Sequence, residues 1–361
     1  MIYNIKMKKI ITFVVLLLIS NYLIAQNLFK GDKCIIKTEF IYQPDDVKFP
    51  SCHASTIAET DKGLIAAWFG GTAERNPDVG IWISRFTEGK WSKPEEAANG
   101  IRENNKRYPC WNPVLYYAPD ELLLFYKVGP SPSEWWGEFI VSDDNGISWS
   151  ASHKLPDGIA GPVKNKPVLL RNGVLLCPSS SENDGWRVHM EMTPDNGITW
   201  TRTSDLNDKN IAAIQPSVLL YPSGKLQILC RSKQSKILAL WSDDNGVSWT
   251  KPEPSSLPNP NSGIDAVSMK NGKHLLVYNH LAAGRNMLNV SISDDGVTWK
   301  AAVLLENDAK DTEYSYPAVI QSKDNMIHIT YTWNRKLIKH VVIDPALIEA
   351  KSFTGGAWPS E

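Results

Sequence analysis

Six polar or ionisable residues stand at the starts of six apolar runs in this sequence. They recur at steps of 49 to 59 residues, at His53, Asn112, Lys166, Gln215, Asp265 and Tyr316. A histidine that titrates near neutral pH, a carboxylate, a lysine and a phenol are groups that can bind a polar ligand or move a proton. Residues so far apart can act together only if the fold gathers the starts of the runs at one place.

A turn motif repeated four times indicates which fold this is. The first copy runs from Ser142 to Trp149 (SDDNGISW), and its relatives begin at Thr193, Ser242 and Ile292. We place the central aspartates at 144, 195, 244 and 294, steps of 51, 49 and 50, and interpret the fourth copy as lacking the leading hydroxyl. Asp-Asn-Gly favours a hairpin turn between two strands, and this period is typical of propeller blades or solenoid turns.

The starts of the apolar runs and the tryptophans that follow them recur with matching spacings, which predicts six repeats. Tryptophans follow the apolar runs at positions 91, 149, 200, 249 and 299, in step with the run starts. We therefore expect an all-β, six-bladed β-propeller with four-stranded antiparallel blades. The sixth repeat has no turn motif, and we expect the early strand 34–40 to complete it, because a closed ring leaves no exposed edge.

This fold would bring the six polar residues together. The first strand of each blade lines the central channel, so the starts of these strands should ring one mouth. The turn motifs should lie on the opposite face. The expected pocket contains no metal-ligand spacing and implies no cofactor.

The N-terminal sequence and the net charge limit the expected cellular location and partners of the protein. Lysines precede an apolar run from Ile10 to Ile24 and small residues follow it, which is the pattern of a secretory signal over residues 1–25. Residues 26–361 would then form one domain, secreted or periplasmic, with no membrane span and no cysteine for a lipid anchor at the cleavage point. A signal anchor is the alternative. The net charge of −1 provides no basic stripe, so we expect no nucleic-acid partner.

The cysteines and tryptophans each allow more than one structural role. Cys177 and Cys230 lie in apolar strands and are expected to be buried thiols, whereas Cys52 and Cys110 could form a disulfide. Several of the 14 tryptophans stand outside the turn motif and could either pack in the core or stack on sugars: Trp68, Trp111, Trp135, Trp136, Trp186 and Trp333.

With these motifs the chain resembles the sialidase (neuraminidase) superfamily, whose repeated turn is the Asp box. The resemblance implies that Arg231 and Arg285 clamp a substrate carboxylate and that Asp78, 25 residues after His53, is the acid/base group, with Glu74 as its local rival. It implies that Tyr316 is the nucleophile, although Tyr314 is two residues away. The remaining ring residues would bind substrate: Asn112, Lys166 and Asp265.

Two positions depart from the sialidase pattern. His53 replaces the first clamp arginine, and Gln215 replaces the glutamate that activates the tyrosine. A neutral amide cannot take a proton from a phenol. Either His53 is the base, or water attacks directly with assistance from Asp265 or His53, or the fold is kept and the chemistry has changed.

Three functions follow from the resemblance. The first is an exported exo-acting glycosidase that removes a terminal acidic sugar, either sialic acid or a related keto-deoxy or uronic sugar. The second is a non-catalytic propeller that binds an acidic glycan. The third is a polysaccharide lyase on the same scaffold. In each case the partner is an acidic glycan, and the oligomeric state is left open.

Overall fold

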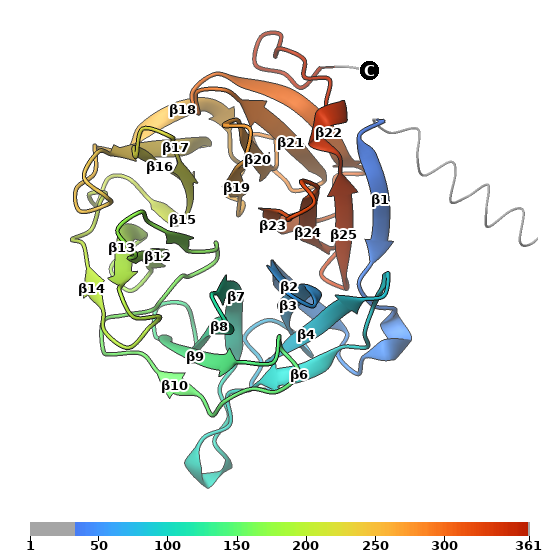
Figure 1. Cartoon of the computed structure of the whole chain (residues 1–361), viewed down its shortest axis with the longest axis vertical. Helices are drawn as coiled ribbons and strands as arrows, with labels where there is room; N and C mark the ends of the chain where they lie inside the picture. Colours follow the sequence, from blue (N-terminus) through green and yellow to red (C-terminus); the bar gives the residue numbers. More distant parts are fainter. Residues whose placement is uncertain (1–32, 360–361) are drawn as a thin grey trace, which may run out of the picture.

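A computed structural model describes residues 33–359, and its strands form six sheets arranged around a central axis (Figure 1). Helical structure in this part of the chain is confined to three single 3₁₀ turns: η1 (Pro44–Asp46), η2 (Glu103–Asn105) and η3 (Pro345–Leu347). The six-bladed, all-β prediction is confirmed. The predicted signal over residues 1–25 lies outside the described residues, and no helix within them is both long and apolar enough to cross a membrane.

The first three blades follow one another along the chain, each with its innermost strand first. Blade 1 contains β2 (Ser51–Thr60), β3 (Gly63–Gly71), β4 (Gly80–Thr87), β5 (Lys90–Trp91) and the extra strand β6 (Glu95–Ala98), which pairs with β4. Blade 2 contains β7 (Cys110–Ala118), β8 (Glu121–Val128), β9 (Trp136–Ser142) and β10 (His153–Lys154). Blade 3 contains β11 (Val168–Leu169), β12 (Leu175–Ser181), β13 (Arg187–Thr193) and β14 (Thr201–Arg202).

The last three blades repeat the order, and the sixth closes the ring. Blade 4 contains β15 (Ala213–Leu220), β16 (Leu226–Ser232), β17 (Lys236–Ser242) and β18 (Glu253–Pro258). Blade 5 contains β19 (Asp265–Ser268), β20 (His274–Tyr278), β21 (Met287–Ser293) and β22 (Trp299–Asn307). Blade 6 contains β23 (Tyr314–Gln321), β24 (Ile327–Trp333) and β25 (Leu337–Ile343), completed by β1 (Ile35–Phe40), which pairs antiparallel with β25 as predicted.

Antiparallel pairing assigns each turn to one face of the ring. The start of an inner strand lies beside the end of the second strand, as in the pairs Ser51 with Gly71 and Tyr314 with Trp333. The inner-strand starts and the loops between second and third strands therefore share one face, here called the mouth. The Asp boxes join third to fourth strands and lie on the opposite face, as predicted.

The Asp boxes are held by their own side chains. In the first copy, Ser142 Oγ accepts from the Gly146 amide at 2.7 Å, and Asp144 Oδ1 accepts from the Ser148 amide at 2.8 Å. The fourth copy corrects the sequence interpretation, because Ser293 Oγ bonds Asp295 Oδ1 at 2.9 Å and accepts from the Gly296 amide at 2.9 Å. The hydroxyl is therefore present, the central aspartate is Asp295, and the residue missing is the asparagine before the glycine.

A repeated β-bulge shapes the inner strands. The pairing of the first two strands shifts register in blades 1, 2, 4 and 6, and at each shift one residue has positive φ: Ala54, Asn112, Gln215 and Tyr316. Such bulges re-aim side chains. In blade 1 the equivalent position is Ala54, one residue after His53. The predicted ring is therefore out of register by one residue in blade 1.

Core packing accounts for the cysteines. Cys52, Cys110, Cys177 and Cys230 are buried free thiols, so the possible disulfide between the first two is not formed. Trp68 and Trp111 are also buried, at 0% and 2% exposure. These two tryptophans belong to the core rather than to a sugar-binding surface.

Candidate functional site

The mouth carries a polar site at the inner-strand starts and second-to-third strand loops. Tyr316 is at its centre, on the bulge of β23. Its hydroxyl oxygen accepts from Arg231 Nη1 at 2.7 Å and from Gln215 Nε2 at 3.2 Å. Arg231 Nη1 also donates to Gln215 Oε1 at 3.2 Å. Arg231 and Gln215 both donate to the tyrosine oxygen, an arrangement that suits an oxygen carrying negative charge.

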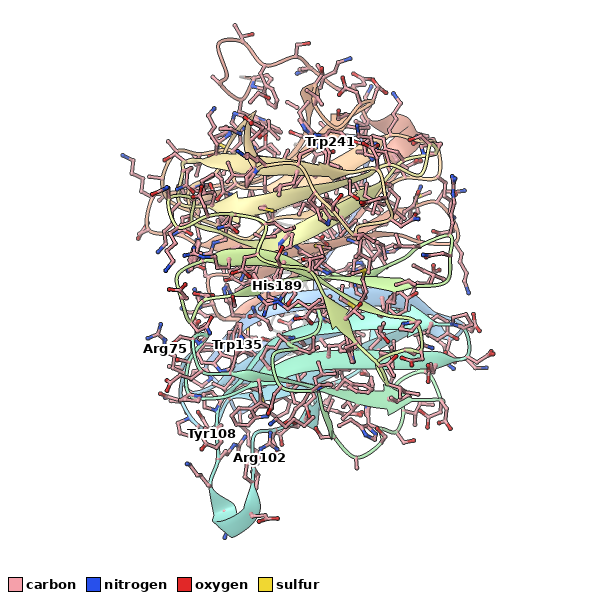
Figure 2. The ribbon with its side chains drawn as sticks, turned by 90° about the vertical axis from the view of Figure 1, so that its left-hand side faces the viewer. Arg75, Arg102, Tyr108, Trp135, His189 and Trp241 are labelled. Carbon is pink, nitrogen blue, oxygen red and sulfur yellow. The ribbon has the colours of Figure 1, made fainter. Side chains whose placement is uncertain are left out.

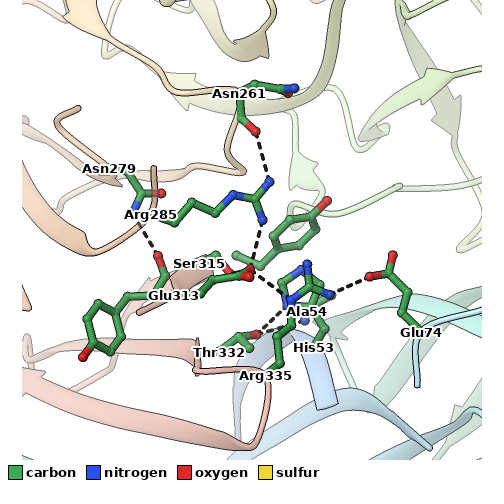
Figure 3. A network of polar contacts seen from close by, with 12 residues as sticks. His53, Ala54, Glu74, Asn261, Asn279, Arg285, Glu313, Ser315, Thr332 and Arg335 are labelled. Atoms are coloured by element: carbon green, nitrogen blue, oxygen red, sulfur yellow. Dashed lines mark hydrogen bonds and ion pairs between the residues drawn. The ribbon is translucent and has the colours of Figure 1, made fainter. Parts of the chain in front are cut away.

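Three arginines are linked into one network around this tyrosine. Asn261 joins the first two, because its Oδ1 accepts from Arg231 Nε at 2.9 Å and its backbone oxygen accepts from Arg285 Nη2 at 3.1 Å. Glu313 Oε1 then accepts from Arg285 Nη1 and from Arg335 Nε, each at 3.0 Å. Figure 3 shows Arg285 between Asn261 and Glu313, and Arg335 extending toward Glu74. The structure thus brings the two predicted clamp arginines together and adds a third.

Arg335 was missed by the sequence reasoning. It lies in the hairpin turn between β24 and β25, where Asn334 and Arg335 both have positive φ, at 50° and 57°. A positive φ is uncommon for residues other than glycine, and such strain clusters at functional sites. A usable signal was its place in the repeat, because Arg231 is the penultimate residue of the second strand of blade 4 and Arg335 follows the second strand of blade 6 by two residues.

His53 is buried beside the tyrosine rather than bonded to its hydroxyl. The two ring centroids are 4.1 Å apart, and His53 Nδ1 hydrogen-bonds Thr332 Oγ1 at 3.1 Å. Burial and the positive charges of Arg335, Arg285, Arg231 and Lys164 hold the pKa of His53 well below its ordinary value. These surroundings disfavour the charged imidazole, and the role of His53 as base or as replacement for a clamp arginine stays a prediction.

Two carboxylates of the loop after β3 have different surroundings. The predicted acid, Asp78, is exposed, and its Oδ2 accepts from the Thr72 amide at 2.9 Å and from the Thr72 hydroxyl. Glu74, its rival, accepts from Arg335 Nη1 at 2.5 Å. The loop is thus tied at its base through Asp78, while Glu74 joins the arginine network. The role of Asp78 as the acid stays a prediction.

Lys166 and Asp265 of the ring bind each other. Their side chains form an ion pair at 2.9 Å that links blades 3 and 5, and Asp265, 1% exposed, also accepts from Ser217 Oγ and the Val319 amide, each at 2.8 Å. Lys164 lies nearby, and burial lowers its pKa to about 7. Its ammonium donates to the Ile264 oxygen at 2.8 Å and to the Pro317 oxygen. These groups hold the channel wall beneath Tyr316, and a direct contact of Lys166 or Asp265 with substrate stays a prediction.

The remaining candidates, Asn112 and Tyr314, are both buried but lie in different places. Asn112 is 5% exposed at the bulge of blade 2, in the position equivalent to Gln215 and Tyr316. Tyr314 is 1% exposed within the core between blades 5 and 6, and its hydroxyl donates to Asp308. Burial raises the pKa of Tyr314. Of the two tyrosines, Tyr316 is the one whose hydroxyl joins the arginine network.

The arrangement can bind an anion strongly. Guanidinium groups from three different blades belong to one hydrogen-bonded network, in which Arg231 contacts Tyr316, and an arginine fork matches the two oxygens of a carboxylate. The carboxylate of Glu313 already lies between two of these arginines, at 27% side-chain exposure, and their charges lower its pKa against the opposing effect of its burial. The site thus has the charge and geometry for a planar acidic group.

Comparison with known proteins agrees with the fold. The family model described as a BNR repeat-like domain matches residues 62–329. No curated protein matches the chain. A Dyadobacter fermentans protein of unknown function superposes with a TM-score of 0.71 at 16% identity, over 86% of this chain and 98% of its own.

Two sialidase-type enzymes share this architecture at similarly low identity. The Hadza microbial sialidase Hz136 gives a TM-score of 0.74 at 16% identity, over 86% of this chain and 69% of that one. The intramolecular trans-sialidase from Ruminococcus gnavus, solved with oseltamivir carboxylate, gives 0.69 at 14% identity, over 88% and 99%. At these identities the likeness shows the fold alone.

Proposed function

This chain belongs to the BNR repeat-like domain family and has a sialidase-like fold, and from this premise we propose that it is an exo-acting glycoside hydrolase. Its substrate would be a glycan that ends in an acidic sugar, sialic acid or a related keto-deoxy or uronic sugar. We also propose that the chain is exported to the periplasm or the medium, on the N-terminal sequence pattern alone.

One observation carries the proposal, namely that Arg231, Arg285 and Arg335 are joined through Asn261 and Glu313 into one network that contacts Tyr316 through Arg231. A charge-assisted hydrogen bond contributes roughly 1.5–3 kcal/mol, so three such donors favour an ionised ligand group over a neutral one. In sialic acid and related keto-deoxy sugars the carboxylate is bonded to the anomeric carbon, so the clamp would place that carbon beside the tyrosine oxygen. The same clamp would therefore give both affinity and orientation.

The chemistry would use Tyr316 as nucleophile. Its oxygen would bond to the anomeric carbon while the glycosidic bond breaks, and the leaving oxygen would take a proton from a carboxylic acid of the 72–79 loop, where Glu74 and Asp78 are the candidates. Because Gln215 cannot accept the phenol proton, that proton would pass to solvent water before attack, and Gln215 and Arg231 would each donate one hydrogen bond to the resulting phenolate. In the second step water would attack the anomeric carbon and give its proton to the loop carboxylate, while the bond between the sugar and the tyrosine oxygen breaks.

Product analysis on a panel of sialylated and uronic glycans tests the proposal. We expect a free acidic monosaccharide from the non-reducing end, with the remaining glycan saturated. An unsaturated, ultraviolet-absorbing product would replace hydrolysis with a lyase reaction. Binding of acidic sugars without product would leave a lectin-like propeller, and neither binding nor product would overturn the proposal.

A further inference from the structure

The two bulges that carry Gln215 and Tyr316 contain backbone oxygens that lie outside the ladders of the sheets. A register shift leaves Gln215 and Pro216 of blade 4 out of the pairing with the neighbouring strand. A second shift does the same for Tyr316 and Pro317 of blade 6. Gln215 and Tyr316 also have positive φ, at 55° and 53°. A buried backbone oxygen without a ladder partner needs another donor, and a strained residue persists only where its surroundings hold it.

Two consecutive residues, Lys164 and Asn165, supply these donors from the segment that precedes β11 of blade 3. Lys164 Nζ donates to the Pro317 oxygen in the bulge of blade 6. Asn165 Nδ2 donates to the Gln215 and Pro216 oxygens in the bulge of blade 4, each at 3.0 Å. We call Lys164 and Asn165 the channel post, because this pair reaches from one blade to the bulges of two others.

The channel post is buried, and the polar groups of both side chains have partners. Lys164 and Asn165 are 3% and 2% exposed. Lys164 Nζ also donates to Asn165 Oδ1 and to the Ile264 oxygen, each at 2.8 Å, so its three acceptors match the three N–H donors of an ammonium group. Figure 2 shows the loops of the mouth from the side, where exposed Arg75 and half-buried Trp135 are labelled. Unlike these loop residues, the channel post has almost no contact with solvent.

The channel post also lies close to the side chains of the two bulge residues. A methyl group on Gly263 would lie 3.4 Å from Tyr316 Cδ2 and 3.5 Å from both Gln215 Oε1 and Lys164 Cε, so these three side chains border the same small space. The Tyr316 hydroxyl meets Gln215 Nε2 at 3.2 Å and Arg231 Nη1 at 2.7 Å. A movement of either bulge would change these two bonds, and a displacement of about 1 Å at a reacting group can cost about a hundredfold in rate.

Two of the arginines that would bind the substrate carboxylate are held by other groups. Arg285 bonds to Asn261 and Glu313. Arg335 bonds to Glu313 and Glu74. The channel post takes no part in these bonds, so its loss would disturb the tyrosine while leaving Arg285 and Arg335 in place. Positioning of the tyrosine and binding of the carboxylate are therefore separable by mutation.

We propose that Lys164 and Asn165 are positioning residues, which hold the bulges of blades 4 and 6 so that Gln215 and Arg231 both donate to the Tyr316 hydroxyl. The effect on turnover rests on the proposed function, in which Tyr316 is the nucleophile. The alternative is a purely structural channel post, whose loss would lower stability without moving Tyr316. The position of Tyr316 can be measured without any substrate.

Steady-state kinetics on an acidic glycoside would compare two variants of the channel post. Lys164→Met removes the ammonium, and Asn165→Asp keeps the oxygen that accepts from Lys164 but removes both donors to the bulge of blade 4. Each should lower kcat about tenfold to a hundredfold and change KM by less than about twofold. The matched control is Lys270→Met on the opposite face, since this exposed lysine also donates to three oxygens, and it should leave both constants unchanged.

Fluorine NMR of protein that contains 3-fluorotyrosine would measure the position of Tyr316 directly. Its signal is assigned by its absence from Tyr316→Phe. At about pH 6, where Lys164 with its pKa of about 7 is mostly charged, the signal should shift or broaden in Lys164→Met and Asn165→Asp. The signal of Tyr314, in the core on the same strand, should stay in place, and Lys270→Met should move neither signal.

The two readouts separate this proposal from the function proposed above. An unmoved Tyr316 signal in folded variants would overturn the positioning role, whatever their stability or turnover. A shifted signal together with a parental kcat would overturn it as well. A shifted signal in a protein that hydrolyses no acidic glycoside would remove the proposed function but leave the channel post as the support of Tyr316. If Lys164→Met does not fold, Asn165→Asp, which keeps the ammonium, decides the test.

Discussion

The two faces of this propeller are built from the same repeat but use it differently. On the face opposite the mouth, four Asp boxes repeat one set of contacts, with a hydroxyl, an aspartate and backbone amides satisfying each other locally. At the mouth, the equivalent loops carry unlike residues that bond across blades, such as Glu74, Arg285 and Arg335. Contacts that stay within one turn stabilise a blade, whereas contacts between blades can assemble a site.

The largest expected effect belongs to the mouth. Tyr316→Phe removes the oxygen that Arg231 and Gln215 approach but leaves the ring beside His53. We expect turnover of an acidic glycoside to fall at least about a hundredfold, with substrate affinity nearly unchanged. Steady-state kinetics would check this, and Tyr314→Phe, in the core, serves as the matched control. An unchanged kcat in the Tyr316 variant would remove the tyrosine from the mechanism.

The next effect tests the arginine that the sequence did not reveal. Arg335→Ala should weaken binding of an acidic monosaccharide by roughly 10- to 150-fold, the equivalent of 1.5–3 kcal/mol, because it removes a charged donor and leaves Glu313 less compensated. Lys336→Ala, at the adjacent exposed position of the hairpin, is the control. Equal affinities of the two variants in calorimetry would restrict the clamp to Arg231 and Arg285.

A smaller effect is expected on the opposite face. Ser142→Ala leaves the Gly146 amide without its side-chain acceptor and removes a bond to Asp144. We expect a loss of about 1 kcal/mol in the free energy of unfolding, with no change in acidic-sugar affinity. Urea titration beside a binding measurement would show this. A change in affinity without a change in stability would mean that the two faces are coupled.

The smallest effect is an absence of titration. The pKa of His53 is lowered because burial and nearby arginines disfavour its charged form. The contribution of His53 to the free energy of unfolding is therefore fully present above the unfolded-state pKa of about 6.5. It decreases as the pH falls below that value, because the unfolded ring takes up a proton that the folded ring resists. Within the folded protein, acidic-sugar affinity should not change between pH 6 and 8 on account of His53. NMR titration of its ring would check this, and a midpoint near 6.5 would contradict it.

The sequence predicted the fold well because the repeat is visible at two independent landmarks. It also placed Gln215 and Tyr316 together correctly, since the inner-strand starts of a propeller meet at one mouth, and the resemblance to sialidases added Arg231 and Arg285, which Asn261 joins. Two predicted positions were wrong by one residue, one in the fourth Asp box and one in the inner strand of blade 1. A deletion hid Ser293 in the fourth box, and a bulge in blade 1 moved the ring position from His53 to Ala54.

Other parts of the site could not be deduced from the repeat. The place of Arg335 in the repeat was a usable signal, but its ion pair with Glu74 joins two loops whose paths depend on contacts between blades rather than on the period of the strands. Tyr314 and Tyr316 are indistinguishable in an extended strand, and only the bulge directs the latter toward Arg231. The bonds of the channel post likewise depend on how blades 3, 4 and 6 meet.

A crystal structure with a bound acidic monosaccharide tests the central claim most directly. We expect the sugar carboxylate within hydrogen-bond distance of Arg231, Arg285 and Arg335, with the anomeric carbon next to the Tyr316 oxygen. A carboxylate bound away from these arginines, or an anomeric carbon remote from Tyr316, would contradict the account.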